Sequence, residues 1–181
     1  MRCATEGTDL GTAAVAPYVS GRWLFSHNGK VEGWPDSVAG LAATLSASTL
    51  LGLEARVDSA LLWALVRHRL ELGVTAEQAL AETVLTLRAA GVTGRFNFLL
   101  TDGRVIAATA AGDTLWYRSG LAGSFVIVAS EPGDDEPGWT EVPDDCVVDA
   151  TRQQVSVAEL TALNVQAVSY THLTLPTNRE V

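Results

Sequence analysis

The sequence predicts a single α+β domain in which helices pack on an antiparallel sheet. Three observations support this fold class. The chain has 181 residues, 48% of them hydrophobic, which suits one domain with a substantial core. Short apolar runs separated by Gly-containing turns fill most of the second half, as is typical of antiparallel strands. Between the first such run and the others lie stretches with helical apolar spacing, and this order of strand, helices and strands indicates α+β.

The net charge of −9 comes mainly from one segment. Residues 131–149 contain eight acidic residues and no basic one, whereas the other 13 acidic and 12 basic residues nearly cancel. The scattered basic residues form no stripe of the kind that binds nucleic acid. The acidic segment, with two Pro-Gly pairs, is typical of a solvated loop. A calcium site from Asp134, Asp135 and Glu136 is the alternative, but these residues lack the alternating spacing of an EF-hand loop.

The sequence also bears on compartment and cofactors. It has no apolar signal-peptide core at its start and no apolar run approaching the length of a membrane span. Cys3 and Cys146 form neither a Cys-x-x-Cys pair nor a disulfide framework. We therefore expect a cytoplasmic protein with no membrane partner. No metal or organic cofactor is implied, and the oligomeric state stays open.

The first clear element is a buried strand at 23–25, preceded by a strand end and loop at 2–9. Its apolar run stops at Asn28-Gly29, and both residues tolerate the positive φ of a tight turn, so a hairpin turn is the plainest interpretation. Ser26 and His27 lie where this strand surfaces. A turn there can also direct a side-chain amide and a backbone N–H at one point, as an oxyanion hole requires.

Helical spacing follows the first strand. A short helix is expected from Ser37, ending before Gly52. The clearest helix extends from Asp58, whose carboxylate is placed to cap the N-terminus, to Gly73, a natural C-terminal cap. Its expected apolar face comprises Leu61, Leu62, Leu65, Val66 and Leu72, and His68 is expected to face solvent.

Another helix opens with the capping box Thr75-Ala76-Glu77-Gln78 and ends at Gly91. Its expected buried face comprises Leu80, Val84 and Leu87. The period then changes, and residues 96–110 predict a hairpin around the turn Asp102-Gly103. Further strands are expected at 114–118, 124–130 and 146–150. The continuous apolar run predicts that 124–130 is buried on both faces, and Cys146 is expected to be an inert core thiol.

Three short motifs then align in one order: Arg2-Cys3-Ala4-Thr5-Glu6-Gly7, Ser26-His27-Asn28-Gly29 and Val57-Asp58-Ser59. Together they resemble the class II glutamine amidotransferase domain. That family is an N-terminal-nucleophile (Ntn) hydrolase fold, a four-layer αββα sandwich with antiparallel sheets. Residues 97–103, 114–118 and 128–132 resemble one branch, the γ-glutamyl hydrolase of ergothioneine biosynthesis. This branch removes glutamate from γ-glutamyl-hercynylcysteine sulfoxide. The resemblance covers about residues 2–150.

The resemblance implies a role for each matched residue. Arg2 would pair with the α-carboxylate of the γ-glutamyl group, as a planar guanidinium suits, and Thr5 would line the same pocket. Asp58 would receive the α-ammonium, and His27 would join these substrate-binding residues. The Asn28 amide and the Gly29 N–H would stabilise the oxyanion formed by attack on the γ-amide. The expected partner is a small-molecule γ-glutamyl substrate, with no nucleic acid and no membrane.

The sequence departs from the family at both ends. The family nucleophile is a cysteine at residue one of the mature chain, with its α-amino group as the base. Here Cys3 lies inside the arginine motif, so it cannot replace that nucleophile without displacing Arg2. We therefore expect residues 1–167 to be a partial, inactive domain that lacks the N-terminal strands and the catalytic cysteine of an active parent. Residues 168–181 resemble translated sequencing-adapter DNA and are expected to be a non-native tail.

Two alternatives remain open from the sequence. The first alternative to a hydrolase fragment is a glutaminase domain of another amidotransferase. The second is a non-catalytic module that binds γ-glutamyl groups without a nucleophile. The first predicts a fused synthetic domain, and the second requires that the chain folds alone.

Overall fold

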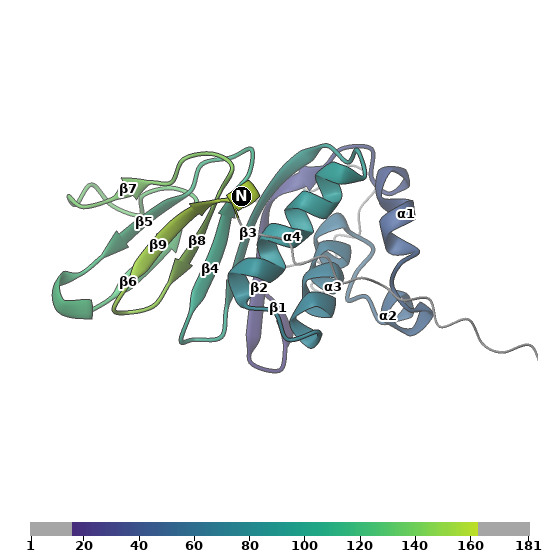
Figure 1. The fold of residues 1–181 in the computed structure, drawn as a ribbon, viewed down its shortest axis with the longest axis horizontal. Coiled ribbons are helices and arrows are strands. Elements are labelled where there is room, and N and C mark those ends of the chain that lie inside the picture. Colours follow the sequence, from purple (N-terminus) through teal and green to yellow (C-terminus); the bar gives the residue numbers. More distant parts are fainter. Residues whose placement is uncertain (1–15, 163–181) are drawn as a thin grey trace, which may run out of the picture.

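The computed structural model describes residues 16–162 of the chain (Figure 1). The predictions made for Arg2, Thr5, the strand end at 2–9 and the tail at 168–181 fall outside the described residues. The domain limits at 167 and 168 fall outside them too.

Two antiparallel sheets and four α-helices make up the described fold. The larger sheet has the order β1-β2-β3-β4-β8-β9, comprising β1 (Tyr18–Ser20), β2 (Trp23–Val31), β3 (Gly94–Thr101), β4 (Ile106–Ala110), β8 (Cys146–Ala150) and β9 (Val155–Glu159). The smaller sheet has the order β6-β5-β7, comprising β5 (Trp116–Ser119), β6 (Val126–Ala129) and β7 (Thr140–Glu141). The helices are α1 (Ala39–Ala42), α2 (Ala47–Leu51), α3 (Asp58–Glu71) and α4 (Ala76–Ala89), with 3-10 turns at Asp36–Val38, Leu121–Gly123 and Leu160–Ala162.

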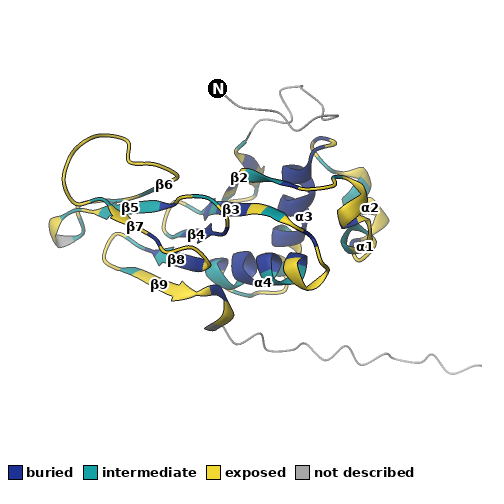
Figure 2. Ribbon diagram, turned by 90° about the horizontal axis from the view of Figure 1, so that it is seen from above, coloured by how far each residue is buried: buried dark blue, intermediate teal, exposed yellow. Residues whose placement is uncertain are grey.

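The elements stack in layers, as Figure 2 shows from above. Helices α3 and α4 pack on one face of the six-stranded sheet, and their shared core includes Trp63, Leu80 and Phe98. The other face of that sheet meets the three-stranded sheet through a second cluster that includes Ala108, Leu115 and Val148. The predicted α+β class is confirmed. The described residues supply three layers of the expected sandwich, in the order helix, sheet, sheet.

Strand β2 is longer than predicted, and the predicted turn at Asn28-Gly29 is wrong. The strand continues through this dipeptide to Val31, with Asn28 opposite Asn97 and Gly29 opposite Phe96 of β3. Glycine is needed here for another reason than a turn. Its φ is +149°, a conformation that residues with a Cβ rarely adopt. On its other edge, β2 pairs with β1 only over Trp23–Phe25, so Ser26–Val31 has no strand partner there among the described residues.

The helices confirm the capping box and correct two details. Thr75 and Gln78 form the reciprocal bonds of the box at the start of α4. Helix α3 begins with Val57 at the N-cap position, so the prediction of Asp58 as the cap is wrong. Leu72 is 60% exposed and does not belong to the apolar face. The buried part of α3 ends at Val66, and Leu72 is the C-cap residue beyond it. Gly73 follows the helix with φ +86°, as a C-terminal glycine should.

Other predictions have mixed outcomes. The expected helix from Ser37 is a 3-10 turn followed by two short helices, α1 and α2, with Ser46 capping the second. The β3–β4 hairpin is confirmed, and Asp102 accepts the backbone N–H groups of its turn. Strand β6 is not buried on both faces: Ile127 is 38% exposed, because one side of the small sheet faces solvent.

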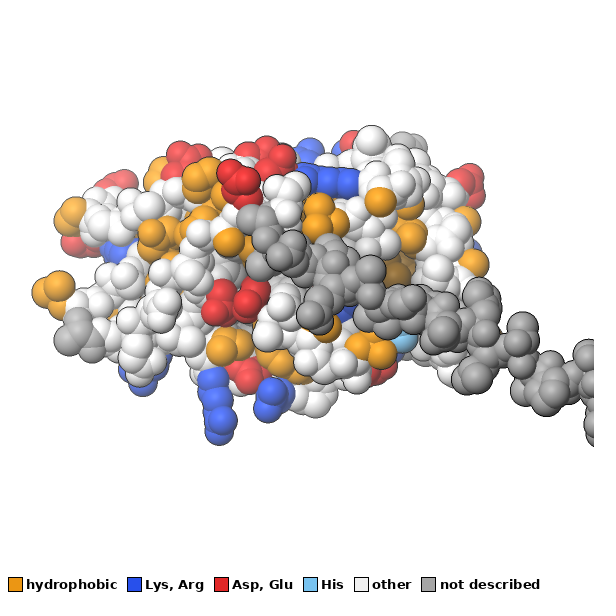
Figure 3. All heavy atoms as spheres, in the orientation of Figure 1, with side chains coloured by type: hydrophobic (Ala, Val, Ile, Leu, Met, Phe, Trp, Pro, Cys, Tyr) orange, Lys and Arg blue, Asp and Glu red, His pale blue; other side chains and the backbone are white. Residues whose placement is uncertain are grey.

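The acidic segment begins as the exposed loop that was predicted. Residues 131–138 are all exposed, and Asp134 pairs with Arg118 of β5. The segment then continues into β7 and β8, so only its first part is a loop. On the face shown in Figure 3, acidic side chains lie along the edge near β7, and basic side chains are scattered.

Candidate active site

The candidate site lies on β2, whose side chains alternate between two layers. Phe25 and His27 point to the helices, where Phe25 stacks on Trp63 of α3 with ring centroids 5.3 Å apart. Ser26 and Asn28 point the other way and line a pocket next to the three-stranded sheet. The side chains of the Ser-His-Asn-Gly motif are therefore divided between the two faces of the sheet.

The pocket beside Asn28 has a volume of about 250 Å³. Its walls come from both sheets and include Ser26, Asn28, Leu99, Thr114, Leu115 and Val128. None of its lining residues carries a charge. The pocket therefore suits an uncharged group near the Asn28 amide, and it offers no cation to a carboxylate.

Asn97 builds one wall of this pocket, a role that the sequence did not assign. It is 4% exposed and lies opposite Asn28 in the β2–β3 ladder. Its amide nitrogen donates to the carbonyls of Asp113 and Thr114, at 2.8 and 3.2 Å. Its amide oxygen accepts from the N–H groups of Ala111 and Asp113. Asn97 thus fastens the β4–β5 turn to β3 and fixes the position of Thr114 in the pocket.

A buried polar network occupies the helix side of β2. The His27 ring is 7% exposed, with Nδ1 3.0 Å from Ser59 Oγ and Nε2 2.9 Å from the Arg95 carbonyl oxygen. At the start of α3, Asp58 Oδ1 accepts from Ser59 N–H at 2.7 Å and lies 3.2 Å from Ser59 Oγ. Asp58 Oδ2 accepts the N–H of Val31 at 3.0 Å. The network links the first turn of α3 to β2 and β3.

Gly29 lies against this network. A Cβ at position 29 would be 2.1 Å from the Arg95 carbonyl oxygen and 2.9 Å from His27 Nε2. The Val31 N–H turns away from β3 to reach Asp58, and alternate residues of a strand point their N–H groups to the same edge. That alternation places the Gly29 N–H on the edge of β2 that has no strand partner among the described residues.

The predicted site residues divide as follows. Asp58 and His27 lie together on the helix side, the Asn28 side chain lies in the pocket on the other side, and Gly29 lies between them in the strand. Arg2 and Thr5 lie outside the described residues. Ser59 was missed; the signal for it was a hydroxyl directly after Asp58 at a helix start.

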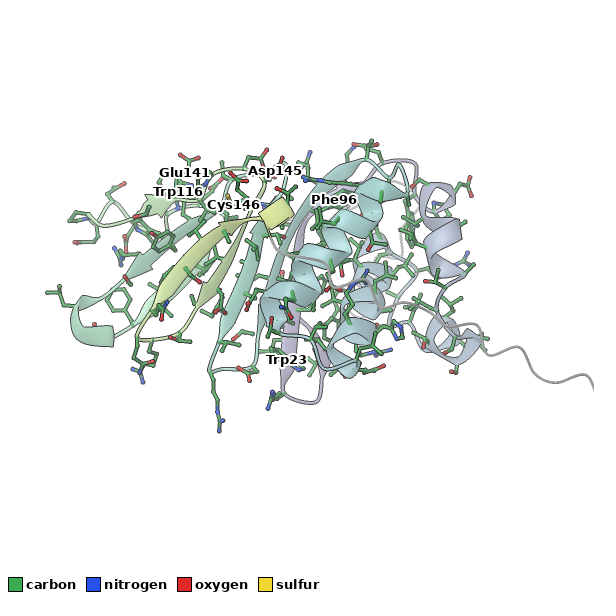
Figure 4. The ribbon with its side chains drawn as sticks, viewed as in Figure 1. Trp23, Phe96, Trp116, Glu141, Asp145 and Cys146 are labelled. Atoms are coloured by element: carbon green, nitrogen blue, oxygen red, sulfur yellow. The ribbon has the colours of Figure 1, made fainter. Side chains whose placement is uncertain are left out.

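Cys146 does not belong to this site. It is buried on β8, and burial raises the pKa of its thiol, as do Glu159 and the other nearby acids. Figure 4 shows it near Asp145, and β3 and β4 separate its strand from β2, a distance of about 14 Å at ordinary strand spacing. In residues 16–162, no three His, Cys, Asp or Glu side chains are grouped as metal ligands would be, and no helix has the length and hydropathy to cross a membrane.

The fold is that of class II glutamine amidotransferases. A class II domain protein from Silicibacter pomeroyi has a TM-score of 0.62 at 22% identity, covering 82% of this chain and 72% of that one. A predicted glutamine amidotransferase from Pseudomonas aeruginosa has a TM-score of 0.58 at 17% identity, covering 81% of this chain and 66% of that one. Glutamine phosphoribosylpyrophosphate amidotransferase from B. subtilis has a TM-score of 0.59 at 16% identity, covering 84% of this chain and 33% of that one. At these identities, the similarity establishes the fold alone.

Sequence comparison narrows the assignment, although no family model matches the chain. The γ-glutamyl-hercynylcysteine sulfoxide hydrolase of Mycolicibacterium smegmatis is 35% identical over 160 residues, which are 88% of this chain and 62% of that protein. The enzyme of the same name from Mycobacterium tuberculosis is 35% identical over 161 residues, which are 88% of this chain and 60% of that protein. The chain therefore has the fold of class II glutamine amidotransferases and is similar in sequence to these hydrolases. It spans about three fifths of their length.

Proposed function

We propose that this chain is part of a protein of its relatives' length that hydrolyses a γ-glutamyl amide. The substrate class is γ-glutamyl-hercynylcysteine sulfoxide, from which glutamate is released. The observation that carries this proposal is the 35% identity to two hydrolases of that name over 88% of the chain. The longer protein is called the whole protein below.

The proposed reaction is acyl transfer through a cysteine. The thiolate of an N-terminal cysteine of the whole protein attacks the γ-carbonyl carbon, and the α-amino group of that cysteine takes up the thiol proton. The negative charge that develops on the carbonyl oxygen is stabilised by the Asn28 amide and the Gly29 N–H. The tetrahedral intermediate then expels the amine, which takes the proton, and leaves a γ-glutamyl thioester. Water hydrolyses this thioester to release glutamate and regenerate the thiol.

The spacing of Asp58 and Gly29 supports this assignment. Asp58 reaches the open edge of β2 at Val31, and Gly29 lies two residues along the same edge, about 6.6 Å away at ordinary strand rise. The α-nitrogen and γ-carbonyl carbon of a glutamyl group are about 5 Å apart at standard bond lengths. One group at each end of this interval therefore suits a glutamyl chain.

Asp58 keeps acceptor capacity for the ammonium. A carboxylate has about four lone-pair positions, and among the described residues Oδ2 accepts only the Val31 N–H, while Oδ1 accepts the Ser59 N–H and has Ser59 Oγ 3.2 Å away. One position on Oδ2 therefore has no donor among the described residues. With Arg2 on the α-carboxylate and Thr5 beside it, these groups would select γ-glutamyl amides over ordinary peptides.

The test is release of glutamate by the whole protein from a γ-glutamyl-cysteine sulfoxide. Asn28→Ala should lower kcat about 100- to 1000-fold with little change in KM, because its amide acts only on the oxyanion. Arg2→Lys should raise KM, because a point charge replaces a bidentate fork. Gln153→Ala, an exposed amide on the β8–β9 turn, is the matched control and should leave both constants unchanged.

Two results would overturn the proposal. The first is a whole protein that folds and binds the substrate without releasing glutamate, as a non-catalytic binding module would. The second is a strong preference for free glutamine with release of ammonia, as expected of a glutaminase domain.

A further inference from the structure

His27 immediately precedes the two residues proposed for the oxyanion hole, yet its side chain lies on the opposite face of β2 from Asn28. Its ring packs edge-on against Phe98, with centroids 5.4 Å apart, and both ring nitrogens have partners in the protein. A ring held in this way is placed to support the strand.

These two partners of its ring nitrogens, both among the described residues, indicate how the neutral ring is protonated. A carbonyl oxygen only accepts hydrogen bonds, so His27 Nε2 must carry the proton that it donates to the Arg95 carbonyl. The neutral ring then presents Nδ1 as an acceptor. Ser59 has one hydroxyl proton and two acceptors within reach, His27 Nδ1 at 3.0 Å and Asp58 Oδ1 at 3.2 Å, and the nearer one, Nδ1, receives it. Ser59 thus selects one tautomer, and its own position is set by the bond from its N–H to Asp58.

This tautomer acts directly on the backbone at Gly29. The Arg95 carbonyl that receives the Nε2 proton is the atom that a Cβ at position 29 would meet at 2.1 Å. His27 Nε2 itself would lie 2.9 Å from that Cβ. The imidazole and the carbonyl therefore pack directly against the Cα of Gly29 on the helix side of β2.

We propose that His27 and Ser59 are positioning residues that hold the Gly29 N–H, and with it the Asn28 amide, in the orientation that receives the oxyanion. His27 acts through the Arg95 carbonyl and does not touch the substrate. This inference rests on the proposed hydrolysis, and it moves His27 from the substrate-binding group to the support of the oxyanion hole.

The test removes one hydroxyl and compares it with a matched hydroxyl elsewhere. Ser59→Ala deletes the donor to His27. The control is Thr83→Val, because Thr83 is fully buried on α4 and its Oγ1 donates to the Ala79 carbonyl at 2.7 Å, away from β2. In the whole protein, Ser59→Ala should lower kcat about tenfold with KM within about twofold, the size of effect that one hydrogen bond supports. Thr83→Val should leave kcat unchanged, and Ser59→Thr should restore most of the activity.

The split between kcat and KM separates this role from others. If Ser59→Ala raised KM and left kcat unchanged, the hydroxyl would act on substrate binding through Asp58, and the proposal would be overturned. If Ser59→Ala matched Thr83→Val in kcat, its role would be structural only, and the proposal would be overturned as well.

A measurement without turnover separates this inference from the proposed function. In ¹⁵N NMR spectra of the whole protein, His27 should be the Nε2–H tautomer, and the Gly29 amide should exchange with solvent faster in Ser59→Ala than in Thr83→Val. These results would support the positioning role even if the wild type released no glutamate. An Nδ1–H tautomer, or equal exchange in the two variants, would refute it.

Discussion

Gly29→Ala tests how tightly the backbone of β2 is enclosed. The new methyl group would lie 2.1 Å from the Arg95 carbonyl oxygen, whereas real Cβ contacts are essentially never below 3.0 Å. One strand must therefore move by at least 0.9 Å, the difference between these two distances. Neither strand yields easily, because β2 and β3 pair along their whole common length.

Two costs add to the expected loss of stability. A non-glycine residue in a sparsely populated backbone region costs about 1–3 kcal/mol. Overpacking a tight site costs about another 1–3 kcal/mol. We therefore expect Gly29→Ala to reduce the free energy of unfolding by about 4 kcal/mol. At an m-value of about 2 kcal/mol/M, the urea midpoint should fall by about 2 M.

Two other glycines separate the strain from the collision. Gly73 has φ +86° with nothing within 4 Å of a Cβ, so Gly73→Ala carries the conformational cost alone, about 1–2 kcal/mol. Gly40 lies in α1 in open space, and Gly40→Ala should stabilise by about 0.5–1 kcal/mol. Urea unfolding of the three variants in the whole protein gives the order directly. A Gly29→Ala loss no larger than that of Gly73→Ala would refute the collision argument.

Three further predictions follow from single side chains. Asn97→Ala should reduce the free energy of unfolding by about 3 kcal/mol, because it leaves the N–H groups of Ala111 and Asp113 without their acceptor. A loss under about 1 kcal/mol in urea unfolding would contradict this. Burial, and then the Asp149 carboxylate, raise the pKa of Glu77, so the folded state favours its protonated form. Its stabilising contribution is complete below the ordinary pKa of a glutamate and is lost as pH rises through the folded-state value. Glu77→Gln should therefore raise Tm at pH 7 but not at pH 4, and equal shifts at both pH values would count against it. Finally, burial raises the pKa of the Cys146 thiol, so its alkylation at pH 8 should be slow until the protein unfolds. Mass spectrometry of the peptide that contains Cys146 measures the labelled fraction. Rapid labelling of the folded protein would show that the thiol is accessible.

The parts of the fold that local chemistry controls were predictable from the sequence. The capping box at Thr75 and the turn at Asp102-Gly103 depend on bonds within a few residues, and both are present. The motif residues and their order predicted the family as well, because that resemblance does not depend on knowing the packing.

The errors come from partners distant in sequence. Asn28-Gly29 has the composition of a turn, but β3, almost 70 residues later, extends the strand through it. Asp58 has the composition of a cap, but the Val31 N–H, 27 residues earlier, takes up its Oδ2. Because the strand continues, His27 and Asn28 face opposite layers, and no motif could show that separation.

The open edge of β2 has a thermodynamic consequence. Beyond Phe25, no strand among the described residues pairs with this edge, and the proposed Gly29 donor lies on it. A segment of the whole protein that paired there would favour the ordered strand, and the ordered strand would bind that segment more tightly by the same factor. Ordering of that segment and readiness for catalysis would then be one equilibrium, so a weakened strand contact would be observed as a reduced fraction of active molecules.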